Sequence, residues 1–215
     1  MSERGIFITL EGPDGSGKST QASLLASRLE AEGHNVTRTF EPGGTSTGKR
    51  LREIILDHRS AGMCGVTEFL LYAADRAQDV HEVIVPALRG GRIVVAERFV
   101  DSSIAYQGYG LGMDIDEVKA VNRIATRGLV PDLTLLLDID PALGVRRATD
   151  CHEADRIEQR KLDFHMAVRN AYLMLAADEP ERFRVIEVGE RPISEVHEEI
   201  YDAGKKFLAT QMRGD

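Results

Sequence analysis

A glycine-rich segment near the N-terminus carries residues that could bind phosphate. It reads GPDGSGKST over residues 12–20 and fits the pattern G-x-x-x-x-G-K-[ST]. Glycines at these spacings let backbone N–H groups turn toward phosphate oxygens, and the positive end of a following helix adds to their effect. The predicted phosphate-binding residues are Gly12, Pro13, Asp14, Gly15, Ser16, Gly17, Lys18, Ser19 and Thr20.

Two side chains of this loop have the chemistry needed to handle a nucleoside triphosphate. Lys18 would place a point charge on the β and γ phosphates, and the Ser19 hydroxyl would bind the Mg²⁺ that accompanies ATP. Phosphoryl transfer needs little covalent help, because positioning and charge neutralisation lower most of the barrier. The loop therefore predicts a MgATP site, while the acceptor has to be inferred from the rest of the chain.

Further along the chain, other side chains could bind a second molecule. Tyr72 and Arg76 are four residues apart, so on a helix the ring could stack on a base while the guanidinium binds its carbonyl edge. Such a pair, taken alone, is more often an ordinary helix face. Arg52 and Arg98 could each grip a phosphate with two N–H groups, although each alone could equally be a surface residue.

The absence of certain motifs from the sequence excludes one class of P-loop protein, the switch GTPases. A switch GTPase usually carries N-K-x-D and a D-x-x-G after its third strand, whereas this chain has Glu97 and Arg98 at that point and no N-K-x-D. Two classes stay open, which are a kinase for a small acceptor and a non-catalytic ATP-binding regulator. A regulator would need Lys18 but would leave Arg52 and Arg156 without a role.

The elements that must position these residues are visible in the hydrophobic pattern. Apolar runs rich in β-branched residues cover residues 5–11, 35–40, 92–97, 133–139 and 183–188. Because they are apolar at successive positions, they predict a three-layer α/β/α fold with a five-stranded parallel sheet. The helices predicted between and after them cover residues 17–32, 46–58, 65–89, 114–127, 141–149, 155–178 and 192–210.

The candidate residues gather where such a sheet binds ligands, beyond the carboxyl ends of its strands. Residues 12–20, 41–44 and 97–107 follow the first three apolar runs. No repeat, low-complexity tract or linker divides the chain. We therefore predict a single domain over residues 1–215, with a mobile lid segment around residues 146–160.

Composition excludes several classes of protein. The net charge of −8 argues against nonspecific nucleic-acid binding, which usually leaves a basic patch. No stretch reaches the roughly 20 apolar residues of a membrane span. Cys64 and Cys151 are too few and too isolated for a disulfide framework. We expect a cytoplasmic protein that binds neither nucleic acid nor a membrane.

Five motifs occur in order along the chain. They are EGPDGSGK at 11–18, EPGGT at 41–45, LYAADR at 71–76, ERFVDSSIAYQG at 97–108 and DRIE at 155–158. Their order and spacing together resemble the bacterial type of the thymidylate kinase family over essentially the whole chain. The resemblance implies a P-loop NTPase fold of the nucleotide kinase kind, transfer of the γ-phosphoryl group of MgATP to dTMP in dTTP synthesis, and a homodimer.

The resemblance also implies roles for the acceptor residues. Tyr72 and Arg76 would contact thymine, Arg52 and Arg98 would grip the acceptor phosphate, and Asp14 would face the sugar 3'-hydroxyl and the metal region. A kinase for another nucleoside monophosphate or for a non-nucleotide alcohol is the main alternative.

Four more acceptor-site residues are implied in the same way. Gln107 would lie near the base, Ser103 at its polar edge and Tyr106 beside the sugar C2', where its ring would disfavour a ribose hydroxyl. Glu41 would help to arrange the centre, although an acid in a Pro-Gly-Gly turn could also simply be solvated.

The lid is expected to supply a cation. Family members without a basic residue inside the P-loop carry one on the lid, and residues 13–16 are non-basic here. Arg156 is the first candidate, with Arg147 and Arg146 behind it, and Arg147 is also assigned to the donor nucleotide. The predicted catalytic residues are thus Lys18, Glu97, Arg98 and Arg156.

Three departures from the family pattern bear on these assignments. Glu97, expected with Ser19 at the metal, stands where Asp is usual, and Phe40 stands where a basic residue is commoner. The lid stretch 148–155 contains Asp150, Glu153 and Asp155 but no Arg or Lys.

Overall fold

The central feature of the fold is a five-stranded parallel sheet. The computed structural model describes residues 4–151 and 155–211, and its strands lie in the order β2-β3-β1-β4-β5. All five side chains of β1 are buried, as expected for a strand covered on both faces. The predicted α/β fold and its parallel sheet are confirmed. The strands are β1 (Phe7–Glu11), β2 (Val36–Phe40), β3 (Ile93–Glu97), β4 (Leu133–Asp138) and β5 (Phe183–Glu187).

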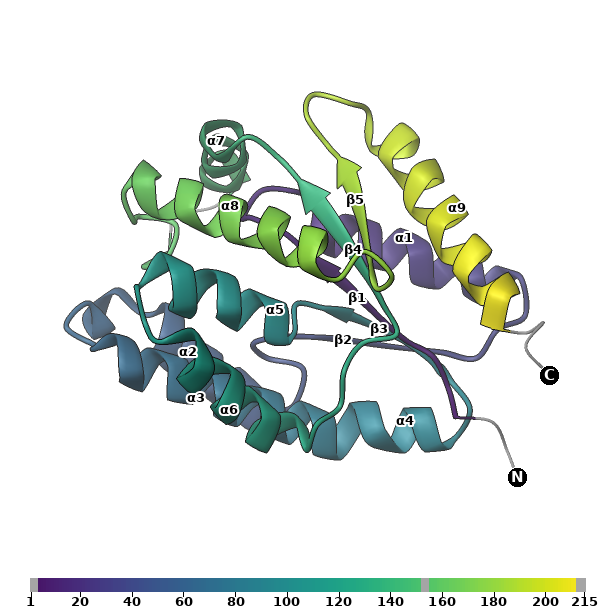
Figure 1. Cartoon of the computed structure of the whole chain (residues 1–215), viewed down its shortest axis with the longest axis horizontal. Helices are drawn as coiled ribbons and strands as arrows, with labels where there is room; N and C mark the ends of the chain where they lie inside the picture. Colours follow the sequence, from purple (N-terminus) through teal and green to yellow (C-terminus); the bar gives the residue numbers. More distant parts are fainter. Residues whose placement is uncertain (1–3, 152–154, 212–215) are drawn as a thin grey trace.

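Helices cover both faces of this sheet (Figure 1). In the part of the chain that the structure describes, no helix is long and apolar enough to cross a membrane. The helices are α1 (Lys18–Ala31), α2 (Ser46–Leu56), α3 (Gly65–Asp79), α4 (Val85–Arg89), α5 (Val100–Ser103), α6 (Ile115–Thr126), α7 (Pro141–Cys151), α8 (Leu162–Asp178) and α9 (Ile193–Gln211), with a 3₁₀ turn η1 (His58–Ser60) and π-helical turns η2 (Val80–Ile84) and η3 (Ile104–Gly110).

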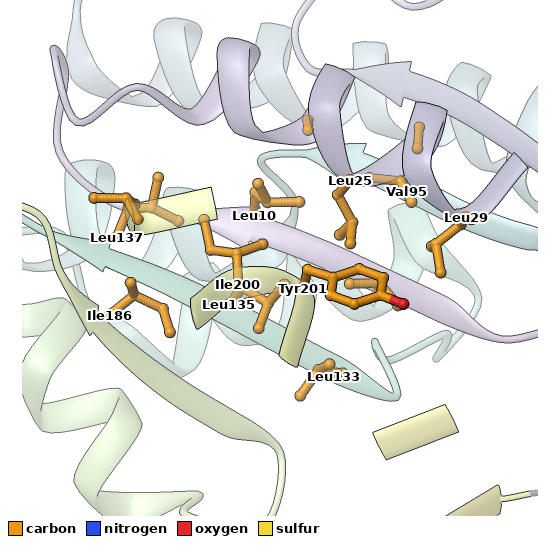
Figure 2. Packing of buried hydrophobic residues seen from close by; sticks show 14 of the residues in the cluster. Leu10, Leu25, Leu29, Val95, Leu133, Leu135, Leu137, Ile186, Ile200 and Tyr201 are labelled. Carbon is orange, nitrogen blue, oxygen red and sulfur yellow. The ribbon is translucent and has the colours of Figure 1, made fainter. Parts of the chain in front are cut away.

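Apolar packing holds helices to each face of the sheet. On one face, Leu25 of α1 and Ile200 of α9 pack with Leu10 and Leu135 of the sheet, as Figure 2 shows. On the other face, Tyr172 of α8 belongs to a second buried cluster. Burying such a side chain contributes roughly 1.5–3 kcal/mol to folding, so the sheet forms a rigid base for the loops at its edge.

The predicted helix over residues 65–89 is interrupted. The structure has α3, the π-helical turn η2 and then α4, with Pro86 near the start of α4. Proline lacks an N–H group and its ring collides with the carbonyl four residues earlier, and a wider turn is one way to accommodate both effects.

Residues 100–110 were not predicted to be helical, yet they form α5 and η3. Gly108 and Gly110 lower the intrinsic helix propensity of this segment. Both glycines are close-packed, since a Cβ atom would stand 2.5 Å from Ile115 at Gly108 and 2.6 Å from Phe164 at Gly110. Tertiary packing therefore stabilises this helix where local propensity does not.

The predicted helix over residues 155–178 begins later, at Leu162. Residues 155–161 form turns in which the Asp155 carboxylate accepts N–H bonds from Ile157 and Glu158 at 2.8 and 2.9 Å. Such local side-chain bonds compete with helical ones. Of the predicted lid residues, Glu153 lies outside the described part of the chain.

Candidate active site

A cavity of about 980 Å³ opens at the carboxyl ends of the central strands. The structure brings most of the predicted site residues to its wall, from the phosphate loop on one side to α3 and η3 on the other. Within the described chain, Gly12, Pro13 and Arg156 lie outside the lining. The predicted residues that line it are Asp14, Gly15, Ser16, Gly17, Lys18, Ser19, Thr20, Glu41, Arg52, Tyr72, Arg76, Glu97, Arg98, Ser103, Tyr106, Gln107 and Arg147.

The shape of the phosphate loop depends on its glycines. Gly12 and Gly15 have φ angles of 140° and 71°, a region that other residues rarely adopt. A Cβ atom at Gly12 would collide with the carbonyl of Leu137, and one at Gly15 with that of Gly144 in α7. Close backbone packing thus aims the start of α1, with its positive dipole end, at the cavity.

Lys18 is buried in this loop. Its Nζ donates to the carbonyl of Pro13 at 2.7 Å, and its exposed fraction is 5%. Burial, reinforced by the positive charge of Arg98, lowers the pKa of Lys18 to about 8. An incoming polyphosphate would relieve both effects.

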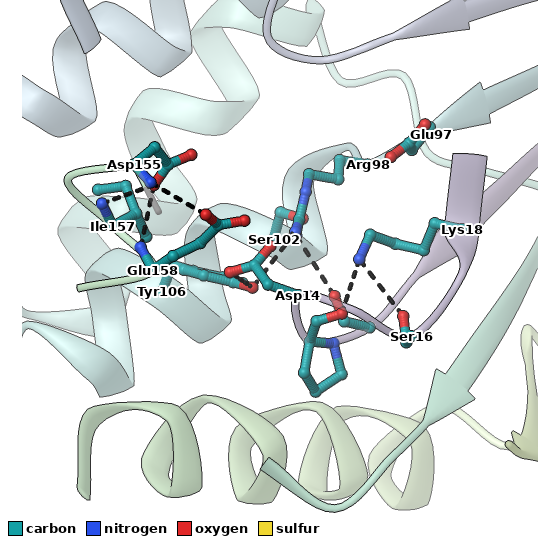
Figure 3. Close-up of polar contacts among 12 residues, drawn as sticks. Asp14, Ser16, Lys18, Glu97, Arg98, Ser102, Tyr106, Asp155, Ile157 and Glu158 are labelled. Atoms are coloured by element: carbon teal, nitrogen blue, oxygen red, sulfur yellow. Dashed lines mark hydrogen bonds and ion pairs between the residues drawn. The ribbon is translucent and has the colours of Figure 1, made fainter. Parts of the chain in front are cut away.

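Asp14, Arg98 and Tyr106 form a linked polar group beside Lys18 (Figure 3). The Arg98 guanidinium pairs with one Asp14 oxygen, and the Tyr106 hydroxyl donates to the other at 2.9 Å. Burial works to raise the pKa of Asp14, but the charges of Arg98 and Lys18 outweigh it and hold that pKa below its usual value. Asp14 therefore stays an ionised carboxylate that can accept a hydrogen bond from a hydroxyl group.

The Arg98 backbone is held in an uncommon conformation. Its φ is 68°, which is rare for a residue other than glycine, and its N–H donates to Leu10 of β1 at 3.0 Å. Uncommon backbone geometry persists where the surroundings determine it, and it is frequent at functional sites.

Sequence reasoning missed a buried group beneath this site. Glu11, fully buried, accepts bonds from the Phe99 N–H, the Ser102 hydroxyl and the Tyr172 hydroxyl at 2.7, 2.7 and 2.9 Å. Burial and the nearby Asp101 raise the pKa of Glu11. Its place at the end of the first strand and its place at the start of the motif over residues 11–18 were the available signals, but its partners lie 88 to 161 residues away.

Glu41 and Arg76 form a buried ion pair. The Glu41 side chain is 2% exposed and Arg76 1%, and Arg76 Nε donates to Glu41 at 2.8 Å. The alternative of a solvated turn acid is therefore wrong. Every nitrogen of Arg76 has a protein partner, including Ser103, Asn122 and the carbonyl of Phe99. The predicted contact of Arg76 with a base stays a prediction.

Ser19 and Glu97 offer oxygen atoms suited to Mg²⁺. The Ser19 hydroxyl donates to the Glu97 carboxylate at 2.8 Å on the exposed side of the loop. Mg²⁺ prefers oxygen ligands and usually binds through one or two protein groups plus substrate phosphates. The described residues hold no cluster of three acids, histidines or cysteines that could bind a metal.

The predicted lid cations lie in different places. The Arg156 guanidinium pairs with Glu68 of α3 at 2.8 Å and donates to the carbonyl of Ile55 at 3.0 Å, and Arg156 does not line the cavity. Arg147 lines the cavity and donates to Gly189 at 2.8 Å. Arg191 also lines the cavity and was missed, although its position just after β5 was a usable signal.

A phosphate loop whose own Asp14 binds Arg98 and Tyr106 in one cavity defines the chain as a P-loop phosphotransferase for a small acceptor. Family comparison agrees, since the model of the thymidylate kinase family matches residues 10–200. The chain belongs to the thymidylate kinase family.

Individual relatives agree closely in length and fold. The chain is 51% identical to a thymidylate kinase of Halothermothrix orenii over 95% of its own length and 99% of the relative's. It is 50% identical to one of Deinococcus radiodurans over 93% and 96% of the two chains. The crystal structure of a thymidylate kinase from Ehrlichia chaffeensis superposes with a TM-score of 0.77 and 32% identity, covering 94% of this chain and 99% of that one.

Proposed function

We propose that this chain transfers the γ-phosphoryl group of ATP to dTMP, giving dTDP and ADP for dTTP synthesis. The observation that carries the proposal is the cavity that Lys18 lines together with the linked group of Asp14, Arg98 and Tyr106. Membership of the thymidylate kinase family supports the same acceptor.

On the donor side, the phosphate loop would bind the triphosphate. Its backbone N–H groups and Lys18 would hold the β and γ phosphates, and Arg147 would contact the nucleotide. Ser19 and Glu97 would hold Mg²⁺, which supplies neutralising charge when bound. The lid cation stays a prediction, since Arg156 would have to leave Glu68 to reach the transferred phosphoryl group.

On the acceptor side, Arg52 and Arg98 would bind the phosphate of dTMP and place it in line with the donor. Asp14 would accept from the 3'-hydroxyl, and its lowered pKa supports that role. Tyr72 and Gln107 would contact the base, and both line the cavity.

We also propose a homodimer formed through α2, α3 and α6. Helix α3 contacts both α2 and α6, and the three helices carry exposed apolar side chains that a partner chain would cover. The exposed fractions are 48% for Ile54, 56% for Val66, 50% for Leu70 and 79% for Ile124. The expected cytoplasmic location stays a prediction.

The decisive experiment measures ADP production from MgATP with dTMP, dUMP, UMP, dCMP, AMP or no acceptor. We expect strong turnover with dTMP, lost in Lys18→Ala while the fold is retained. Turnover with another acceptor alone would keep a P-loop kinase but overturn the base site. ATP binding without transfer would favour a regulator, in which Arg98 and Arg52 have no substrate.

A further inference from the structure

We propose that Glu68 is a positioning residue that fixes the base-reading amide of Gln107 and anchors the C-terminal part of the lid, residues 155–161. The proposal deepens the proposed function, because it rests on Gln107 facing a pyrimidine base. It assigns a role to a buried acid that lies outside the five sequence motifs.

One oxygen of Glu68 holds two arginines. Its Oε2 pairs with Arg156 Nη1 at 2.8 Å and with Arg160 Nη2 at 2.6 Å, and the Glu68 side chain is 2% exposed. Arg156 also donates to Ile55 at the end of α2, and the Arg160 guanidinium lies over the Phe164 ring at 4.5 Å. Residues 155–161 are thereby tied to α2, α3 and α8.

The other oxygen meets the amide of Gln107. Gln107 Nε2 donates to Glu68 Oε1 at 3.2 Å, and Gln107 is 3% exposed. A carboxylate can only accept hydrogen bonds, so it selects the orientation that turns the amide nitrogen toward Glu68. The amide oxygen is left as an acceptor for the ligand.

This orientation has a consequence for base choice. Thymine carries an N–H at N3, and the amide oxygen of Gln107 can accept a hydrogen bond from it. Cytosine has a lone pair at N3 instead, so its N3 and the amide oxygen, both acceptors, would repel each other. A mismatched buried polar contact is a strong source of discrimination. Glu68 would thus favour thymine over cytosine without touching either base.

The same carboxylate links the base site to the lid. If residues 155–161 moved away, Glu68 would be left buried without its two cations, which is strongly unfavourable. Two sites that share one buried group are expected to influence each other reciprocally.

The test compares Glu68→Gln with the matched control Asp138→Asn. The control makes the same acid-to-amide change in the Arg169 pair of β4 and α8, away from the cavity. In Glu68→Gln the Gln107 amide can turn over, so we expect the dTMP-to-dCMP ratio of kcat/KM to fall about tenfold. Amide hydrogen exchange of residues 155–161 in the ligand-free protein should also become faster.

Arg160→Met serves as a second variant, because it removes one cation and keeps the carboxylate. We expect faster exchange of residues 155–161 with the dTMP-to-dCMP ratio retained, which a general loss of stability would not produce. Unchanged exchange and unchanged discrimination in Glu68→Gln, or the same changes in Asp138→Asn, would overturn the proposal. If the unaltered protein phosphorylates no acceptor, the proposed function fails, and hydrogen exchange still decides whether Glu68 seats this segment.

Discussion

Lys18 illustrates how a single residue of the site is held ready for its ligand. Its ammonium group is buried against Pro13, and burial together with Arg98 brings its pKa to about 8. Between this value and the ordinary lysine pKa the folded chain binds fewer protons than the unfolded chain. The stability of the ligand-free protein should therefore rise with pH across that interval.

Nucleotide binding should take up a proton at Lys18. Bound phosphates raise the lysine pKa again, so at about pH 8.5 ADP binding should consume part of a proton and weaken as the pH rises further. Calorimetry in two buffers of different ionisation enthalpy measures this uptake. Lys18→Met should abolish it, and a buffer-independent heat in the unaltered protein would contradict the pKa assignment.

Tyr106 could act on the sugar of the acceptor in two ways, through its hydroxyl group and through its ring. Its hydroxyl supports Asp14 at 2.9 Å, while its ring is predicted to crowd a ribose 2'-hydroxyl. Tyr106→Ala should raise the turnover of the ribo analogue relative to dTMP by about tenfold. Tyr106→Phe keeps the ring and should retain the preference for the deoxy sugar. Equal relaxation in both variants would show that the ring is not the cause.

At the scale of elements, α3 is a helix that buries four ionisable side chains beside apolar Phe69 and Ala73. Glu68, Asp75, Arg76 and Asp79 are each at most 1% exposed. Asp79 accepts from Thr39 of β2 at 2.6 Å, and Asp75 accepts from the backbone of Gly43 at 3.0 Å. Ionisable groups rather than apolar ones thus join α3 to the loop after β2.

This arrangement makes stability depend on pH through Asp79. Burial, together with the negative charge of neighbouring Asp75, raises the pKa of Asp79 to about 7. The bond from Thr39 offsets this increase only in part. A raised carboxyl pKa gives stability that is present at low pH and lost as the pH rises toward 7. Between pH 5 and 8, the ionisation of Asp79 should lower the free energy of unfolding by on the order of 2 kcal/mol, and Asp79→Asn should abolish this decrease.

Urea unfolding followed across that pH range measures the effect. The slope of the unfolding free energy against pH should be shallower in Asp79→Asn than in the unaltered protein. Parallel slopes would mean that Asp79 is ionised in the fold throughout.

At the scale of the whole molecule, the proposed homodimer would cover the exposed apolar side chains of α2, α3 and α6. Leu70→Lys places a charge among its exposed apolar side chains and should convert a dimer to a monomer, because an unpaired charge in an interface is costly. Light scattering after gel filtration gives the mass. Met174→Lys, on the exposed side of α8 at 49% exposure, is the control and should stay dimeric. An unaltered protein with the mass of one chain would overturn the proposal.

Local patterns in the sequence determined much of this protein. Alternating apolar runs and helical segments predicted the parallel sheet, because side-chain periodicity depends on neighbouring residues. The phosphate loop was readable for a similar reason, since Gly12, Gly15 and Lys18 act through the backbone of one short segment. The order of the motifs predicted the family, which the comparisons confirm.

Only the tertiary structure decided which distant groups meet. Arg156 was expected at the transferred phosphoryl group, yet it pairs with Glu68, 88 residues earlier in the chain. Glu11 was hidden in a strand, and residues 155–161 were expected to be helical. In each instance the outcome depends on which partner compensates the free-energy cost of burying a charged or polar group. Which partner is within reach follows from packing across the whole chain rather than from local spacing.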